Sequence, residues 1–170
     1  MNRITFIDDL GLEKFTKNDF ENYYQLVSSE KVMEMITESA ITYRKAKSNF
    51  EKIIQNNDLH PIFGTYKITT DATKDFIGLA KLTINNTDCN EAELGYMLLP
   101  EYWGKGIAGR VSKKLIEIAK SEKKINRIIA IIDPKNMPSR QILIKNEFIS
   151  REFIDFDGLP GEILELKLNE

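Results

Sequence analysis

The chain has 170 residues, and we expect one domain over residues 1–170, because this length is ordinary for a single domain that buries a full core. Hydrophobic residues make up 42% and charged residues 29% of the chain, a composition typical of globular proteins. The 24 basic and 26 acidic residues leave a net charge of −2, which excludes nucleic-acid binding through a broadly basic surface.

The N-terminus and the rare residue types restrict where the protein acts and which cofactors it can hold. Asp8 and Asp9 lie where a signal peptide needs an apolar core, and no apolar run approaches the roughly 20 residues that cross a bilayer. Cys89 is the one cysteine and His60 the one histidine, so an internal disulfide is impossible. These two residues are also too few for a metal site built from cysteine and histidine ligands. We therefore expect a cytoplasmic protein without a membrane partner, a nucleic-acid partner or a metal site.

The first third of the chain reads as one strand followed by two helices. Residues 3–8 alternate between apolar and polar side chains and predict a short strand. Apolar side chains at spacings of three and four then predict a helix over 16–28, with Thr16 or Asn18 as its N-cap. A second helix is predicted over 38–56, and the aromatic side chains of both helices are expected to be core.

The rest of the chain predicts a strand meander followed by alternating helices and strands. Segments 61–68, 75–84 and 91–99 alternate with period two and are joined by short polar turns, which favours antiparallel neighbours. The remaining predicted elements are a helix from about residue 108, a strand over 127–133 that is buried on both faces, a helix over 136–147 and two strands around the turn DGLPG. The order β-α-α-β-β-β-α-β-α-β-β predicts an α/β (α+β) fold with a mixed, mostly antiparallel sheet flanked by helices.

The segment LLPEYWGKGIAGRV, residues 98–111, carries a glycine motif. Gly104, Gly106 and Gly109 match the dinucleotide fingerprint G-x-G-x-x-G, and Asp133 ends a later strand where an acidic ribose ligand is sought. Four residues, PEYW, separate the preceding strand from the first glycine, and a meander precedes that strand, whereas the dinucleotide fold needs a tight turn after a parallel strand. A dinucleotide site is therefore a weak alternative, as is a loop with a purely structural role.

A cradle for a diphosphate explains the glycine segment better. Glycines allow main-chain N–H groups to converge on an anion, and the following helix N-terminus adds its partial positive charge. Lys105 can contribute a point charge. The pattern thus favours a phosphate-bearing ligand beside a meander.

Two blocks of the chain, ELGYMLLPEYWGKGIAGRV and RIIAIIDPKNMPSRQILIKNEFI, resemble the GNAT superfamily of N-acetyltransferases, which binds acetyl-CoA. Within it they are most similar to the ribosomal-protein alanine N-acetyltransferases. The superfamily signature Gln/Arg-x-x-Gly-x-Gly/Ala falls on residues 103–108, with Trp103 in place of the usual first residue. In the second block Glu147 replaces the glycine that usually precedes Phe148, which puts the local turn in doubt.

The resemblance implies a cofactor site built largely from main chain. The main chain of residues 97–99 would pair with the pantetheine arm, and the loop amides would hold the pyrophosphate. The implied cofactor-binding residues are Met97, Leu98, Leu99, Trp103, Gly104, Lys105, Gly106, Ile107, Ala108, Gly109, Arg110 and Asn136. Arg110, Lys113 and Lys114 are alternatives for the 3′-phosphate.

The implied reaction is direct attack of a primary amine on acetyl-CoA in a ternary complex. Glu91 and Glu93 share one strand face near the cofactor, and we choose Glu93 as the group that takes the amine proton. Many family members carry a tyrosine where this chain has Leu143, so the resemblance implies Ser139 as proton donor instead. The amide of Leu98 or Leu99 is expected to stabilise the oxyanion.

The acceptor is expected to be a protein N-terminus or a small-molecule amine, bound by a monomer or homodimer. The alternatives are a non-catalytic acyl-CoA-binding module and a dinucleotide-binding oxidoreductase.

Overall fold

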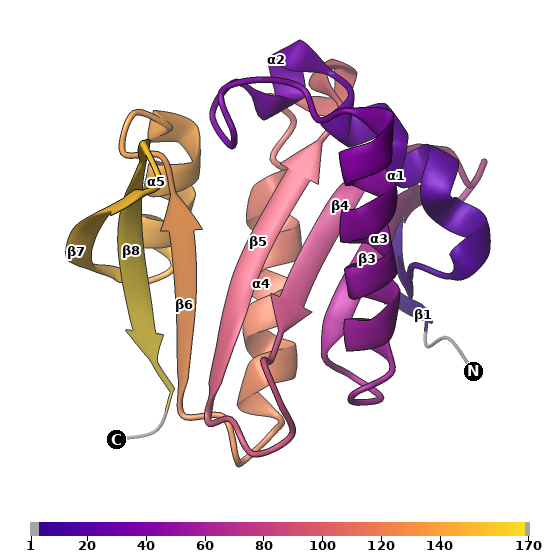
Figure 1. Ribbon diagram of the computed structural model, residues 1–170. Coiled ribbons are helices and arrows are strands. Elements are labelled where there is room, and N and C mark those ends of the chain that lie inside the picture. Colours follow the sequence, from indigo (N-terminus) through magenta and orange to yellow (C-terminus); the bar gives the residue numbers. More distant parts are fainter. Residues whose placement is uncertain (1–3, 169–170) are drawn as a thin grey trace.

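The computed structural model describes residues 4–168, in which eight strands form one sheet of order β1-β2-β3-β4-β5-β6-β8-β7 (Figure 1). The strands are β1 Ile4–Ile7, β2 Leu10–Lys14, β3 Gly64–Thr70, β4 Phe76–Thr83, β5 Glu91–Leu98, β6 Arg127–Ile132, β7 Ile149–Phe156 and β8 Leu159–Lys167. The α-helices are α1 Phe20–Val27, α2 Glu30–Met33, α3 Tyr43–Asn57, α4 Ile107–Lys120 and α5 Met137–Lys145, and short 3-10 turns are η1 Lys17–Asp19 and η2 Pro100–Tyr102.

The strand pairing confirms the predicted fold class. Every neighbouring pair in the sheet is antiparallel except β5 and β6, which are parallel because α4 connects them as a crossover. The chain therefore builds a meander from β1 to β5, crosses over once through α4, and closes with β6, β8 and β7. This arrangement is an α+β fold with a mixed, mostly antiparallel sheet.

The N-terminal third contains two elements that the predicted order lacks. β2 is a separate strand, because Asp8 adopts a left-handed φ of 53° and turns the chain so that Leu10 and Leu12 enter the core. The short helix α2 precedes α3, and α3 begins at Tyr43 rather than near residue 38. Thr16 forms the predicted N-cap, on the 3-10 turn η1 that leads into α1. Arg3, the first residue of the predicted strand 3–8, lies outside the described residues.

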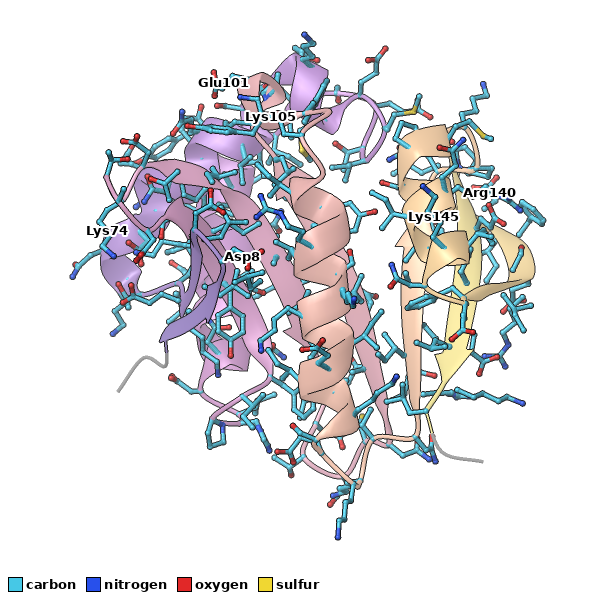
Figure 2. The ribbon with its side chains drawn as sticks, turned by 180° about the vertical axis from the view of Figure 1, so that it is seen from behind. Asp8, Lys74, Glu101, Lys105, Arg140 and Lys145 are labelled. Carbon is cyan, nitrogen blue, oxygen red and sulfur yellow. The ribbon has the colours of Figure 1, made fainter. Side chains whose placement is uncertain are left out.

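Helices cover both faces of the sheet and form two cores. α4 and α5 lie on the face seen in Figure 2, where side chains such as Leu115 and Val111 pack on the strands. α1 and α3 cover the opposite face over β3 and β4 (Figure 1), and Phe20, Tyr23 and Phe50 form the predicted aromatic core there. The same prediction is wrong for Tyr43, which lies at the start of α3 and is 51% exposed. None of the helices described over residues 4–168 is long and apolar enough to span a membrane.

The prediction that 127–133 is buried on both faces is wrong. Ile128 and Ala130 are buried under the helices, but Ile131, on the other face, is 39% exposed. α1 and α3 reach only the β3–β4 side of that face, so β6 is left open there (Figure 1). The apolar side chains on this open face border the cavity described next.

Candidate active site

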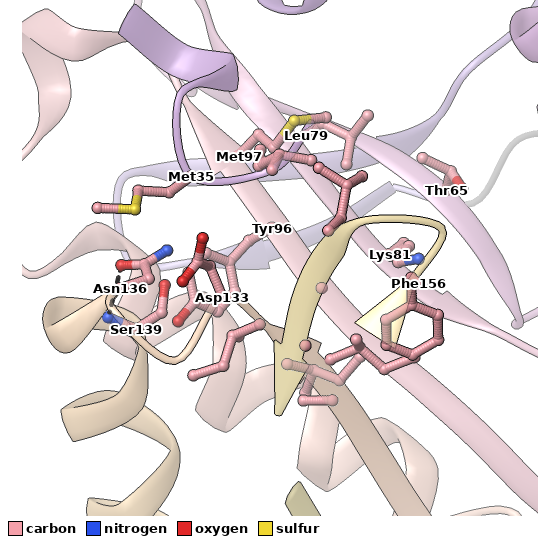
Figure 3. Close-up of a pocket in the computed structure, with 18 of the residues that line it drawn as sticks. Met35, Thr65, Leu79, Lys81, Tyr96, Met97, Asp133, Asn136, Ser139 and Phe156 are labelled. Carbon is pink, nitrogen blue, oxygen red and sulfur yellow. Dashed lines mark hydrogen bonds between the residues drawn. The ribbon is translucent and has the colours of Figure 1, made fainter. Parts of the chain in front are cut away.

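The candidate site lies where β5 and β6 separate. Their pairing ends at Glu93 and Ile129, although β5 continues to Leu98 and β6 to Ile132. Figure 1 shows the two strands diverging toward the C-terminal end of β5. A cavity of about 580 Å³ occupies this region and is lined by α1, α3, the segment after α2, β3 to β6, α5 and the β7–β8 hairpin (Figure 3). The gap between two parallel strands thus leaves main-chain groups of β5 without a strand partner.

The main-chain groups at the end of β5 are divided between the sheet and the gap. The Leu99 N–H donates to the Ile77 carbonyl at 2.9 Å, so this amide is engaged with β4. Neighbouring residues of a strand direct their amides to opposite edges, so the Leu98 N–H is directed into the gap. The Leu98 carbonyl accepts a hydrogen bond from the Trp103 indole at 2.9 Å. Of the two amides considered for the oxyanion, the Leu99 N–H is therefore occupied by β4, and the Leu98 N–H is the one that can face a ligand in the gap.

The glycine loop has an open geometry. Gly104 and Gly106 have φ of 74° and 77°, which side chains rarely adopt, and Gly109 lies in the first turn of α4. A Cβ built on any of the three meets no atom within 4 Å. Gly106 is the N-cap of α4 and supplies no capping side chain, so the first amides of this helix have no side-chain acceptor. This geometry fits a group bound by main-chain N–H donors, such as a pyrophosphate.

The basic side chains of α4 differ in their partners. Arg110 pairs with Asp9 at 2.9 Å and Asp8 at 3.6 Å in the β1–β2 turn, and Figure 2 shows Asp8 beside this helix. The Arg110 guanidinium lowers the pKa of Asp9. Lys114 lies 3.7 Å from a glutamate one turn along α4. Among the ion pairs of the described residues none includes Lys113, so Lys113 is the least neutralised of the three predicted phosphate ligands.

The N-terminus of α5 brings several polar groups to the cavity. Asn136 caps the helix by accepting a hydrogen bond from the Ser139 N–H at 3.3 Å, and both residues line the cavity (Figure 3). Leu143, one turn further along, is 1% exposed and also lines it. The Tyr96 hydroxyl is buried beside Ser139. Burial raises the pKa of Tyr96, and the neighbouring Ser139 hydroxyl partly opposes this shift.

The predicted base, Glu93, is not among the residues that line the cavity. Its carboxylate pairs with the Lys81 ammonium, which lines the cavity, whereas the Glu93 side chain does not. The Lys81 side chain crosses Gly95, where an added Cβ would lie 2.7 Å from it. Glu91, on the same face of β5, pairs with Arg127 of β6 at 2.5 Å. The structure thus brings Glu93 close to the site and shows that both strand carboxylates have cationic partners.

The cavity also contains residues to which the sequence analysis assigned no role in acetyl transfer. Asp133, considered only as a ribose ligand, is the single carboxylate among the lining residues, and Lys52 and Lys81 are the two cations. Met35 and Ile36, from the segment after α2, form an apolar wall. Asp133 lies directly after the end of β6, a position that often carries a functional residue. No sequence spacing links the two lysines or the two apolar residues to the site.

Comparisons with known proteins agree with this geometry. A family model described as an acetyltransferase (GNAT) domain matches residues 9–149. The uncharacterized N-acetyltransferase p20 of Bacillus licheniformis is 24% identical over 162 residues, which cover 95% of this chain and 91% of the relative. The ribosomal-protein-S5-alanine acetyltransferase structure from Vibrio fischeri has a TM-score of 0.79 at 15% identity, covering 99% of this chain and 98% of that chain. The spermidine N-acetyltransferase from Vibrio cholerae, solved with CoA and spermine, has a TM-score of 0.77 at 16% identity, covering 94% and 96%.

The matched segment runs from the start of β2 to the start of β7, so it includes the gap, the glycine loop and α5. The family match and the N-acetyltransferase relatives favour the acetyltransferase over both alternatives of the sequence analysis, the dinucleotide oxidoreductase and the non-catalytic module. The chain belongs to the acetyltransferase (GNAT) domain family and is an N-acetyltransferase.

Proposed function

We propose that the protein transfers an acetyl group directly from acetyl-CoA to a primary amine in a ternary complex. The observation that carries the proposal is the gap between β5 and β6, because the cavity lies at this gap and the open glycine loop follows β5 in the chain. A thioester that enters along β5 reaches the cavity, where an amine can approach it from the side of α1 and α3. The family membership and the CoA complex of the spermidine N-acetyltransferase support the same cosubstrate.

In this proposal the main chain of β5 and the loop hold the cofactor. Met97 and Leu98 extend the strand edge toward the pantetheine arm, and the amides from Gly104 to Gly109 bind the pyrophosphate. Lys113 supplies charge for the 3′-phosphate, because Arg110 is already neutralised by the β1–β2 turn. Trp103, Lys105, Ile107 and Ala108 belong to the same loop and helix start, with Leu99 fixing the strand end and Asn136 closing the far side of the gap.

The reaction needs a neutral amine and a stabilised oxyanion. An ordinary alkyl amine has a pKa of about 10, so it must lose a proton before it attacks. We assign this proton to Glu93, through water, since its carboxylate pairs with Lys81 and Glu93 is not among the residues that line the cavity. The Leu98 N–H, directed into the gap, stabilises the negative charge on the thioester oxygen during attack.

The charges of the cavity restrict the acceptor. The single lining carboxylate, Asp133, can attract one ammonium group, while Lys52 repels further positive charge and the charge of Lys81 is balanced by its ion pair with Glu93. Met35 and Ile36 favour an apolar neighbour of the amine. We therefore propose a protein N-terminus or a small-molecule monoamine as acceptor, in contrast to the polyamine that the name of the Vibrio cholerae relative implies.

Binding is tested first, by thermal unfolding with acetyl-CoA, CoA, NAD and NADP. A ligand present at 100 times its Kd stabilises the fold by about 2.7 kcal/mol. For a chain of this length the midpoint then rises by about 5–10 °C. We expect this rise with acetyl-CoA and CoA alone; a rise with NAD and none with acetyl-CoA would overturn the proposal.

Turnover is then measured as release of CoA thiol with N-terminal peptides, monoamines and spermidine. We expect a monoamine or peptide to be used at a higher kcat/KM than spermidine. Glu93→Gln should lower kcat by about 100-fold, the usual contribution of a general base. The matched control is Glu51→Gln, on the exposed side of α3 and away from the cavity lining. Equal activity of Glu93→Gln and wild type would remove Glu93 from the mechanism.

A further inference from the structure

The thiolate that leaves during acetyl transfer needs a proton, and this chain has no proton-donating side chain at the position on α5 where the donor is expected. Leu143 occupies the position at which many similar enzymes carry a tyrosine, and its side chain is apolar and 1% exposed. Ser139 lies one turn earlier on α5 and lines the same cavity. An alkyl hydroxyl is a far weaker acid than a phenol, so serine alone is a poor replacement for tyrosine.

The phenol of Tyr96 reaches the same part of the cavity from β5 instead of α5. Tyr96 projects from β5 and lines the cavity together with Ser139 (Figure 3), and Leu143 belongs to the same lining. Its hydroxyl oxygen is buried beside the Ser139 hydroxyl, and no other group within residues 4–168 gives it a hydrogen-bond partner. A phenol donates one hydrogen bond and accepts others, so the Ser139 hydroxyl can donate to the Tyr96 oxygen while the phenol proton is left for a partner that arrives with the ligand. The sulfur of a bound thioester is such a partner.

We propose that Tyr96 donates the proton to the departing thiolate and that Ser139 holds the Tyr96 hydroxyl in position. The proposal rests on the acetyl transfer proposed above. Tyr96 lies two residues before Leu98, whose amide we assign to the oxyanion, so both groups act on the same thioester from one strand. Strand alternation places both residues on the same edge and the same face of β5.

The step balances as follows. The amine nitrogen forms a bond to the thioester carbon, and the electron pair of the C=O bond moves to oxygen. When the oxygen returns this pair, the C–S bond breaks and its electrons leave with sulfur. Sulfur takes the proton of Tyr96, and the tyrosinate regains a proton through Ser139 from the nitrogen of the new amide or from solvent. Burial raises the pKa of Tyr96, so the phenol is protonated at neutral pH before each turnover.

The first test needs no acceptor. The pH titration of the CoA thiol, followed by thiolate absorbance in the far ultraviolet, is measured in the complex with wild type, Tyr96→Phe, Ser139→Ala and Tyr43→Phe. Tyr43 is 51% exposed at the start of α3 and does not line the cavity, so it is the matched control. A donated hydrogen bond stabilises the thiolate, so Tyr96→Phe should raise the pKa of the bound thiol. An unchanged thiol pKa would overturn the proposal.

The second test is steady-state turnover with the preferred acceptor. Tyr96→Phe should lower kcat by about 100-fold with little change in KM for acetyl-CoA, as expected for loss of a general acid. Ser139→Ala should lower kcat less, because the phenol remains. Full activity of Tyr96→Phe would refute the assignment, and so would a full loss in Ser139→Ala alone. Failure of the wild-type protein to bind CoA would refute the proposed function as well. If the wild-type protein binds CoA and transfers acetyl groups but Tyr96→Phe behaves as wild type, only the role of Tyr96 is refuted.

Discussion

Replacing Gly109 with alanine is expected to stabilise the fold and to weaken the binding of CoA. Gly109 is the third residue of α4, its φ is not in the left-handed region, and an added Cβ meets no protein atom within 4 Å. Alanine is favoured over glycine in a helix by about 0.5–1 kcal/mol. For this chain length that gain corresponds to a rise of about 1–4 °C in Tm.

The same methyl group would occupy the space above the first amides of α4, where we place the pyrophosphate. A ligand displaced from main-chain donors loses hydrogen bonds to a charged group, and we expect the Kd for CoA to rise about tenfold, which corresponds to about 1.4 kcal/mol. The Kd is measured by calorimetry, and Tm by thermal unfolding without ligand. Opposite changes in stability and affinity are the signature of a glycine retained for binding.

Two controls separate these effects. Gly106→Ala should lose both stability and affinity, because its φ of 77° strains any side chain. Gly158→Ala, with a φ of 91° in the β7–β8 turn, should lose stability and keep the wild-type Kd. The reasoning is refuted if Gly109→Ala binds CoA as tightly as wild type, or if it is less stable than wild type.

Three further predictions follow from single features. Glu147→Gly should stabilise the fold by about 1 kcal/mol in urea unfolding, because Glu147 has a φ of 70° after α5, and an unchanged or lower stability would contradict this. Burial raises the pKa of Tyr23 and Tyr96 in the folded state, so the free energy of unfolding should fall as pH rises above about 10, and the Tyr23→Phe and Tyr96→Phe variants should show a smaller fall. Lys113→Ala should weaken CoA binding more than dephospho-CoA binding, and equal losses for both ligands would place the 3′-phosphate elsewhere.

Several local features were predictable from the sequence because they depend on residues close together in the chain. Thr16 and Asn136 cap their helices as their residue types and positions suggest. The doubt about the turn at Glu147 was justified, since the structure places this residue in the left-handed region and Phe148 N–H bonds the Leu143 carbonyl in a Schellman-type helix end. The positive φ of Gly104 likewise agrees with the expected loop.

Alternation and helical periodicity also predicted most elements, but errors arose where a short segment changed direction. β2 was missed because its sequence LGLEK contains a glycine and two charged residues, which are uncommon in strands, and because the turn at Asp8 carries no glycine. The run 127–133 was read as doubly buried because period analysis detects apolar side chains and not the helix that covers them. Ile131 is apolar and faces a cavity instead of a core.

The sequence by itself determined the glycine loop, the strand that enters it, the helix caps and the family resemblance, because each depends on spacings of a few residues. Only the tertiary structure decided which charges and hydroxyl groups meet. Arg110 is neutralised by Asp9, 101 residues away in sequence, and Lys81 of β4 pairs with Glu93 of the neighbouring strand β5. The Tyr96 hydroxyl faces Ser139 because β5 and β6 separate and α5 begins beside the gap. Such pairs result from the packing of whole elements, and no local spacing in the chain encodes them.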